Sequence, residues 1–133
     1  MAIVFDGSAV IACLAPDEFA DSSLEEILRT NPLIAPPIWP DEVTNAILTM
    51  VRRGRISTNQ ADLAMAAFVA LSAEIEAPDR IRVASAIYPL AKRYALTIYD
   101  ASYLELAQRR KLPLATLDNQ LRVAARKARV KVL

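Results

Sequence analysis

Short apolar segments alternate with longer helical segments along almost the whole chain. The pattern predicts strands at residues 2–5, 33–35, 74–77, 112–117 and 130–133. It predicts helices at residues 9–14, 22–28, 39–53, 57–73, 79–94, 101–110 and 118–128, and Pro89 should kink or divide the helix that contains it. Strands that alternate with helices at this spacing form βαβ units, which require a parallel sheet covered by helices on both faces. We therefore predict one α/β domain over residues 1–133.

Four acidic residues mark the beginnings of predicted helices: Asp6, Glu42, Asp100 and Asp118. Right-handed crossovers bring such helix starts to one edge of a parallel sheet, where open α/β sheets bind ligands. Four carboxylates at one edge would repel one another unless a cation lay among them. Oxygen ligands of this kind suit hard divalent metals, and Mg²⁺ and Mn²⁺ are the usual occupants. The pattern therefore indicates a metal-dependent phosphodiesterase.

Each acid also has a purely structural explanation. Asp6, Asp100 and Asp118 are suitable helix N-caps, a role that contributes about 1 kcal/mol each. Glu42 lies in a first helical turn, where a negative charge suits the helix dipole. For any one acid alone this explanation is the better one, but four such acids in one domain favour a shared site.

Three small polar residues stand two or three positions from these acids: Ser8, Asn45 and Thr116. Groups of this kind orient carboxylates and metal-bound water in metal sites. They are also ordinary as a turn hydroxyl, an exposed helix residue and a strand residue. We include them as candidates that support the site.

The residues that the chain lacks exclude several kinds of chemistry. There is no histidine, so neither a Ser-His-Asp triad nor an HExxH zinc site is present. Two glycines are too few for a Walker A loop or a GxGxxG fingerprint. Cys13 is the only cysteine, which excludes an internal disulfide, and we expect it to be a small buried hydrophobic residue.

Charge is distributed unevenly along a chain whose formal net charge is +1. Residues 1–51 hold eight acids and one base, and residues 106–133 hold eight bases and one acid. The asymmetry predicts a basic face for nucleic-acid phosphates beside an acidic end for metal, although basic residues also stabilise the C-terminal ends of helices. Candidate phosphate contacts are Arg52, Arg53, Arg55, Arg109, Arg110 and Lys111. Trp39 can stack on a base, but a buried aromatic is the better interpretation.

Four segments carry a resemblance to a known family. They are IVFDGSA at 3–9, APPIWPDEVTNA at 35–46, YDASYLELA at 99–107 and LATLDNQL at 114–121. In this order they resemble the motifs of PIN-domain ribonucleases, and especially the VapC-type toxins of bacterial and archaeal toxin–antitoxin pairs. By this resemblance the four acids correspond to the family's metal-binding acids, and Ser8, Asn45 and Thr116 to its supporting polar positions. Gly7 departs from a commoner Ala.

The resemblance has further implications. It implies a three-layer sandwich, with helices on both faces of a parallel sheet of about five strands. It implies an endoribonuclease that hydrolyses RNA with Mg²⁺ or Mn²⁺, a homodimer, and a cognate antitoxin whose C-terminal segment covers the active-site groove. The Ala-rich helix at 57–73 can line that groove or the dimer contact, and core packing explains it equally well.

Two other functions fit the sequence less well. A receiver domain with a phosphorylated aspartate needs a paired acidic cluster near the N-terminus and a lysine at a particular strand end, but Asp6 stands alone and Lys131 lies on the last strand. A catalytically silent PIN-like scaffold should lack some of the acids, and none is missing.

No apolar run reaches the roughly 18 residues of a membrane span. The N-terminus lacks a basic n-region, so we expect a cytoplasmic protein without a signal peptide.

Overall fold

A parallel four-stranded sheet forms the centre of the protein, with the strand order β3-β2-β1-β4. The computed structural model describes residues 1–16 and 21–133, so Asp17 and Glu18 of the acidic N-terminal region lie outside it. The strands are β1 (Ile3–Phe5), β2 (Leu33–Ala35), β3 (Ala73–Ile75) and β4 (Leu114–Ala115). Val132 forms a parallel bridge to Leu114, at the place predicted for a fifth strand. The predicted α/β fold is confirmed.

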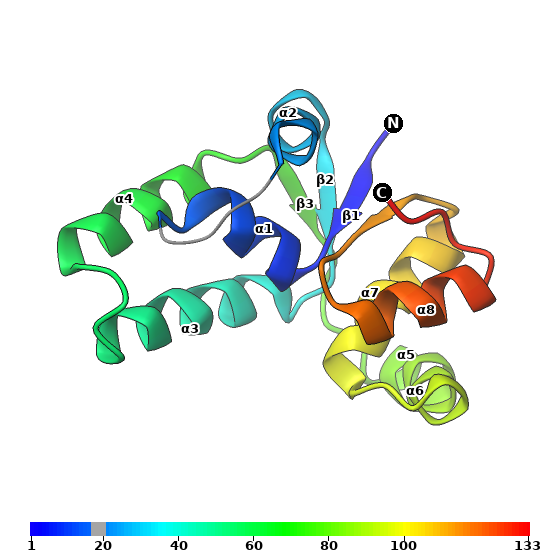
Figure 1. The fold of residues 1–133 in the computed structure, drawn as a ribbon. Helices are drawn as coiled ribbons and strands as arrows, with labels where there is room; N and C mark the ends of the chain where they lie inside the picture. Colours follow the sequence, from blue (N-terminus) through cyan, green and yellow to red (C-terminus); the bar gives the residue numbers. More distant parts are fainter. Residues whose placement is uncertain (17–20) are drawn as a thin grey trace.

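The first half of the chain wraps one side of this sheet (Figure 1). Its helices are α1 (Gly7–Leu14), α2 (Ser22–Thr30), α3 (Trp39–Arg52) and α4 (Thr58–Val69). Side chains define most of their starts: Asp6 caps α1, Asp21 caps α2, and Ser57 with Gln60 forms a capping box before α4. Gly54, at φ +70°, ends the turn after α3 in a conformation that favours glycine.

The second half covers the other side with α5 (Arg80–Arg82), a π-helix η1 (Val83–Ile87), α6 (Tyr88–Tyr94), α7 (Ile98–Arg110) and α8 (Asn119–Lys127). The helix predicted at 79–94 is divided, as Pro89 indicated. The π-helix ends at Ile87, two residues before Pro89, whose missing N–H removes one bond of the helical ladder.

The boundaries predicted around β3 and β4 were wrong. The helix predicted to reach residue 73 ends at Val69, and β3 begins at Ala73. The alanine-rich composition favoured a longer helix, but the Ser72 carbonyl accepts a hydrogen bond from the Leu33 N–H at 2.9 Å, which draws this stretch toward the sheet. Likewise β4 is limited to two residues of the predicted 112–117, because Thr116 already turns toward the site described below.

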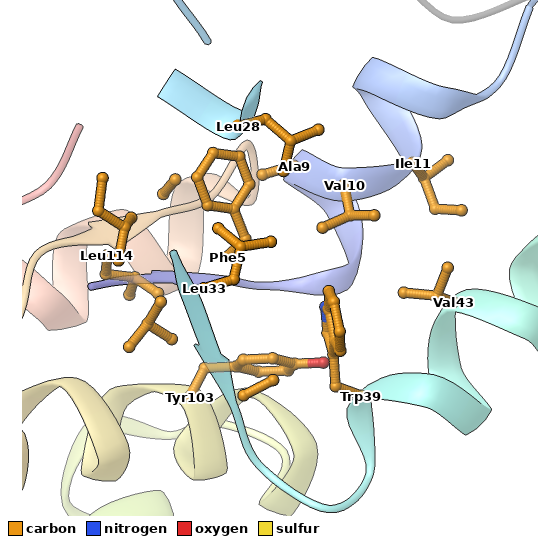
Figure 2. Close-up of a cluster of buried hydrophobic side chains, with 14 of the residues drawn as sticks. Phe5, Ala9, Val10, Ile11, Leu28, Leu33, Trp39, Val43, Tyr103 and Leu114 are labelled. Atoms are coloured by element: carbon orange, nitrogen blue, oxygen red, sulfur yellow. The ribbon is translucent and has the colours of Figure 1, made fainter. Parts of the chain in front are cut away.

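The core lies on both sides of β1 and β2, whose residues are all buried. Figure 2 shows Phe5, Trp39, Tyr103 and Leu114 among the buried side chains that meet there. Trp39 is 2% exposed and its ring centroid lies 4.8 Å from that of Phe68, so it is the buried aromatic that the sequence favoured. Cys13 is partly buried at the edge of this core, where burial raises its thiol pKa to about 11.

Among the described residues, no helix is both long and apolar enough to span a bilayer.

Candidate functional site

The strand order changes direction at β1. The chain passes from β1 to β2 and β3 on one side, then returns to place β4 on the other side of β1. In open α/β sheets, ligands bind at such a switch point, outside the carboxyl ends of the strands. Asp6 follows β1 directly and Thr116 follows β4 directly, so both residues lie at this position.

Asp6 is fixed by three donors. One carboxylate oxygen, Oδ1, accepts the Ala9 N–H at 2.9 Å and the Ser8 hydroxyl at 2.7 Å, while Oδ2 accepts the Thr116 hydroxyl. Asp6 is only 3% exposed, and burial raises its pKa despite these hydrogen bonds. A carboxylate offers about four acceptor positions, so Oδ2 retains capacity for one more partner.

The two supporting hydroxyls also tie the end of β4 to the end of β1. The Ser8 Oγ accepts the Leu117 N–H at 3.0 Å, and the Thr116 Oγ1 accepts the Asp118 N–H at 3.1 Å. Each hydroxyl thus accepts from the backbone after β4 and donates to Asp6 after β1. The arrangement fixes the orientation of Asp6 and orders the segment that carries Asp118.

Glu42 reaches the site from the first turn of α3. Its Oε1 accepts a hydrogen bond from the Tyr103 hydroxyl at 3.0 Å, and its carboxylate also accepts from the Gly7 backbone N–H. A Cβ at Gly7 would lie 2.1 Å from the Glu42 Oε1, so this position of the carboxylate requires glycine there. Burial first, and then the charge of Asp6, raise the Glu42 pKa.

Sequence reasoning missed Tyr103 as a residue of the site. Its backbone lies within buried α7, and its phenol is itself buried, with its pKa raised by burial and by the charge of Glu42. The signal was available, because Tyr103 lies three residues after Asp100 and therefore on the same face of a helix.

Asp100 does not cap its helix, contrary to the prediction. The helix begins at Ile98 rather than 101, and Thr97 is the N-cap, whose hydroxyl accepts the Asp100 backbone N–H at 3.1 Å. The Asp100 side chain therefore does not have the N-cap role predicted for it. Burial, followed by the charges of Asp118, Asp6 and Glu42, raises its pKa to about 6.

Asp118 does serve as an N-cap, since its Oδ1 accepts the Leu121 N–H at 2.9 Å at the start of α8. Asp118 is exposed, whereas Asp6 is buried. Its charge nevertheless contributes to the raised pKa of both Asp6 and Asp100. We call Asp6, Glu42, Asp100 and Asp118 the acidic quartet.

The members of the acidic quartet interact electrostatically but do not form a closed cage. Within residues 1–16 and 21–133, no group of three or more Asp, Glu, His or Cys side chains is arranged to hold a metal ion. Their chemistry does fit one, because carboxylate oxygens are the ligands that Mg²⁺ prefers and a cation would relieve their mutual repulsion. Glu42 is the member whose carboxylate accepts hydrogen bonds from Tyr103 and Gly7.

Asn45 lies beside Glu42 in a hollow of about 310 Å³, which is lined by Ile38, Asp41, Glu42, Asn45 and Tyr99. Asn45 is exposed and shares a face of α3 with Glu42. Asp41 and Tyr99 are further polar residues of this hollow that the sequence did not single out.

The basic residues proposed for phosphate binding lie mostly elsewhere. Arg52 is ten residues beyond Glu42 on α3, which places it about 15 Å along the helix axis. Arg109 hydrogen-bonds to Glu76 at 2.6 Å and to Glu105 at 2.7 Å, and Arg110 pairs with Glu76 at 3.5 Å. The charge count along the sequence did not reveal these ion pairs, because Glu76 lies 33 residues from Arg109.

Comparison with known proteins agrees with this architecture. Ribonuclease VapC3 from Pyrobaculum aerophilum is 26% identical over 121 residues, which cover 91% of this chain and 92% of that protein. The crystal structure of PAE2754 from Pyrobaculum aerophilum superposes with a TM-score of 0.73 at 21% identity, covering 99% of this chain and 83% of that one.

A second solved structure has the same fold. Mycobacterium tuberculosis VapC20, described as a sarcin-ricin loop cleaving toxin, has a TM-score of 0.64 at 14% identity, covering 92% of this chain and 94% of its own. The sequence pattern of the PIN domain matches residues 3–127. Because that match spans nearly the whole chain, the protein belongs to the PIN domain family.

Proposed function

We propose that the protein is a divalent-metal-dependent endoribonuclease that acts as the toxin of a type II toxin–antitoxin system. One observation carries the proposal: at the switch point of the sheet, burial and the charges of other quartet members raise the pKa values of Asp6, Glu42 and Asp100. The names of the relatives, a VapC ribonuclease and a toxin that cleaves the sarcin-ricin loop, support RNA as the substrate.

In this proposal Asp6 is the central metal ligand, oriented by Ser8 and Thr116. Glu42 and Asp100 complete the ligand set, and Asp118 acts directly or through water. Asn45 supports the site from the Glu42 side. A bound Mg²⁺ or Mn²⁺ supplies Lewis-acid stabilisation of phosphoryl oxygens and activation of water. Without histidine in the chain, no imidazole shares this work.

The test compares RNA cleavage by the wild type and by Asp6→Asn, each with Mg²⁺, with Mn²⁺ and with EDTA. We expect cleavage only by the wild type with metal, with a loss above about 100-fold in the variant, since even residues that merely orient metal ligands contribute 10–100-fold. Asp21→Asn is the matched control, because Asp21 caps α2 as Asp6 caps α1 but lies outside the acidic quartet. Cleavage that survives EDTA would contradict the metal mechanism.

The alternative is a PIN-like scaffold that binds RNA or protein without cutting. It predicts no cleavage of any RNA by the wild type, together with metal-independent binding. The same experiment decides between the two, and mapping of broken strands in total cellular RNA after induction identifies the substrate.

We propose a cytoplasmic homodimer and a cognate antitoxin as partners. Helix α4 buries Ala61 and Ala64 but leaves Leu63 72% exposed and Val69 79% exposed. Apolar side chains as exposed as these suit a protein contact. Light scattering of the purified chain, and of Leu63→Ser with Val69→Ser, should give a dimer for the wild type and a smaller species for the double variant. An unchanged mass would place the contact elsewhere.

A further inference from the structure

Tyr99 is a large exposed side chain that stands between two cavities. It lies in the first turn of α7, directly before Asp100, and is 56% exposed. It lines the hollow that contains Glu42 and Asn45, and it also lines a second cavity of about 310 Å³. Ile38 is the other residue common to both linings. An occupant of the second cavity therefore lies next to the hollow that contains Glu42.

The second cavity combines apolar walls with groups that donate and accept hydrogen bonds. Pro36, Pro37 and Ile87 contribute apolar walls, while Glu76 and Arg82 contribute charged groups. The Arg82 guanidinium lies 3.7 Å from Glu76 and 3.8 Å from Glu105, which is longer than a hydrogen bond. Arg82 also lies 3.9 Å from Asp79, so it has three carboxylate neighbours at ion-pair distance, and its side chain is 32% exposed.

This combination suits a flat ring with apolar faces and polar edges. A nucleobase has that form, and unpaired bases of RNA are recognised by stacking on aromatic side chains and by hydrogen bonds to their edges. Folding gives no reason for an exposed tyrosine at this place, since its ring is not part of the core.

We propose that Tyr99 stacks on one unpaired base of the RNA substrate, and that the cavity behind it receives this base next to the phosphodiester at the acidic quartet. The proposal rests on the proposed ribonuclease function. Contact with the hollow of Glu42 favours RNA over a second copy of this chain, because a strand cut at the quartet passes Glu42, and Tyr99 lines the same hollow.

The experiment replaces the bases of a cleaved single-stranded RNA by abasic sites, one position at a time. Binding is measured with Mg²⁺ in the Asp6→Asn background, where the RNA should stay intact, and cleavage is measured with otherwise wild-type protein. We expect one position near the cut where the abasic site weakens binding about 10-fold. Tyr99→Ala should weaken binding of intact RNA by the same factor. In this variant the abasic site at that one position should no longer weaken binding further, while the effects at other positions stay the same.

Two further variants separate stacking from other roles of the residue. Tyr99→Phe keeps the ring and should behave as the wild type. Tyr88→Ala removes a tyrosine that is 52% exposed but lines neither cavity, and it should leave the abasic profile unchanged.

If abasic sites weaken binding equally in the wild-type and Tyr99→Ala backgrounds, the base site is overturned. The proposed function still stands in that case, provided that the wild type cleaves RNA. If light scattering shows that Tyr99→Ala changes the oligomeric state, the cavity belongs to a contact between copies of the chain, and the base site is again overturned. If the wild type cuts no RNA but binding shows the position-specific effect, the base site stands and the nuclease proposal fails. Absence of any RNA binding would overturn both.

Discussion

Helix α7 contributes to two groups of carboxylates. One group forms ion pairs with arginines, and the other does not. Near its start, Asp100 belongs to the acidic quartet, and in the described part of the chain no arginine or lysine lies within ion-pair distance of these four carboxylates. Further along the helix, Glu105 meets Glu76 of the segment after β3, and Arg82 and Arg109 pair with both. We call the second group the arginine cluster.

The pKa of Glu76 in the arginine cluster is lowered, whereas the pKa values of Asp6, Glu42 and Asp100 are raised. Hydrogen bonds from Arg109 lower the Glu76 pKa, although burial acts against them. Burial and neighbouring carboxylates raise the pKa of Asp6, Glu42 and Asp100. The carboxylates of the arginine cluster are paired with arginines of the chain itself, whereas no arginine or lysine in the described residues pairs with the acidic quartet. This difference separates a structural ion-pair network from a candidate metal site.

Breaking the arginine cluster should have the largest effect on stability. Arg109→Ala leaves Glu76 and the buried Glu105 without their main partner, and we expect a loss of about 3 kcal/mol in the free energy of unfolding by urea. Arg29→Ala is the control, because the Arg29–Glu26 pair has side chains 71% and 59% exposed and should cost less than about 1 kcal/mol. Equal costs for the two variants would contradict the comparison.

Metal should stabilise the folded protein through the acidic quartet. At a free Mn²⁺ or Mg²⁺ concentration 100 times Kd, the free energy of unfolding should rise by about 2.7 kcal/mol. Asp6→Asn should remove most of this gain while Asp21→Asn keeps it, which urea unfolding with and without metal can measure. If all three proteins gain equally, the cation binds somewhere else.

Removing one hydroxyl should weaken metal binding without removing a ligand. In Tyr103→Phe the Glu42 carboxylate loses the donor at 3.0 Å that orients it, and we expect the metal affinity by titration calorimetry to fall about 10-fold. Tyr88→Phe alters an exposed tyrosine that does not line the hollow of Glu42 and serves as the control. A tighter Kd in Tyr103→Phe would mean that the bond holds Glu42 away from the metal.

Much of the fold was predictable because it depends on local signals. Gly54, the Ser57–Gln60 capping box and the N-cap Asp6 fixed helix ends at or near the predicted residues. The alternation of strands and helices identified the parallel sheet and the edge where the acids lie. The end of α4 was misplaced, because pairing of the next segment with β2 depends on contacts distant in sequence.

The site was predictable in its residues more than in its interactions. The acids and hydroxyls stand at helix starts that the sequence shows, but the bond between Tyr103 and Glu42 joins residues 61 positions apart. The role of Asp100 also differed, because Thr97 offered an equally suitable cap one turn earlier and took that role. The ion pairs of Arg109 could not be inferred from a charge count, since tertiary packing alone brings Glu76 to it.

The smallest effect we predict concerns how the free energy of unfolding varies with pH. The contributions of Asp100 in the acidic quartet and of Glu76 in the arginine cluster should change with pH in opposite directions. Asp100 has a folded pKa of about 6 against an ordinary value of 3.8, so the folded state binds more protons than the unfolded state between these values. Its contribution to stability is therefore full below about pH 4 and is lost as pH rises through about 6. Glu76, with a lowered pKa, contributes stability above its ordinary value of 4.5 that is lost as pH falls.

Urea unfolding in EDTA from pH 4 to 7 checks this slope by comparing the wild type with Asp100→Asn. The stability of the wild type relative to the variant should decrease as pH rises to about 6 and then level off, and partial exposure of Asp100 to solvent keeps the change small. Saturating Mg²⁺ should reverse the trend, because a bound cation favours the ionised carboxylate that the folded protein otherwise resists. A relative stability that does not vary with pH in either condition would mean that the acidic quartet is not electrostatically coupled, and the reason for a cation at this edge of the sheet would be lost.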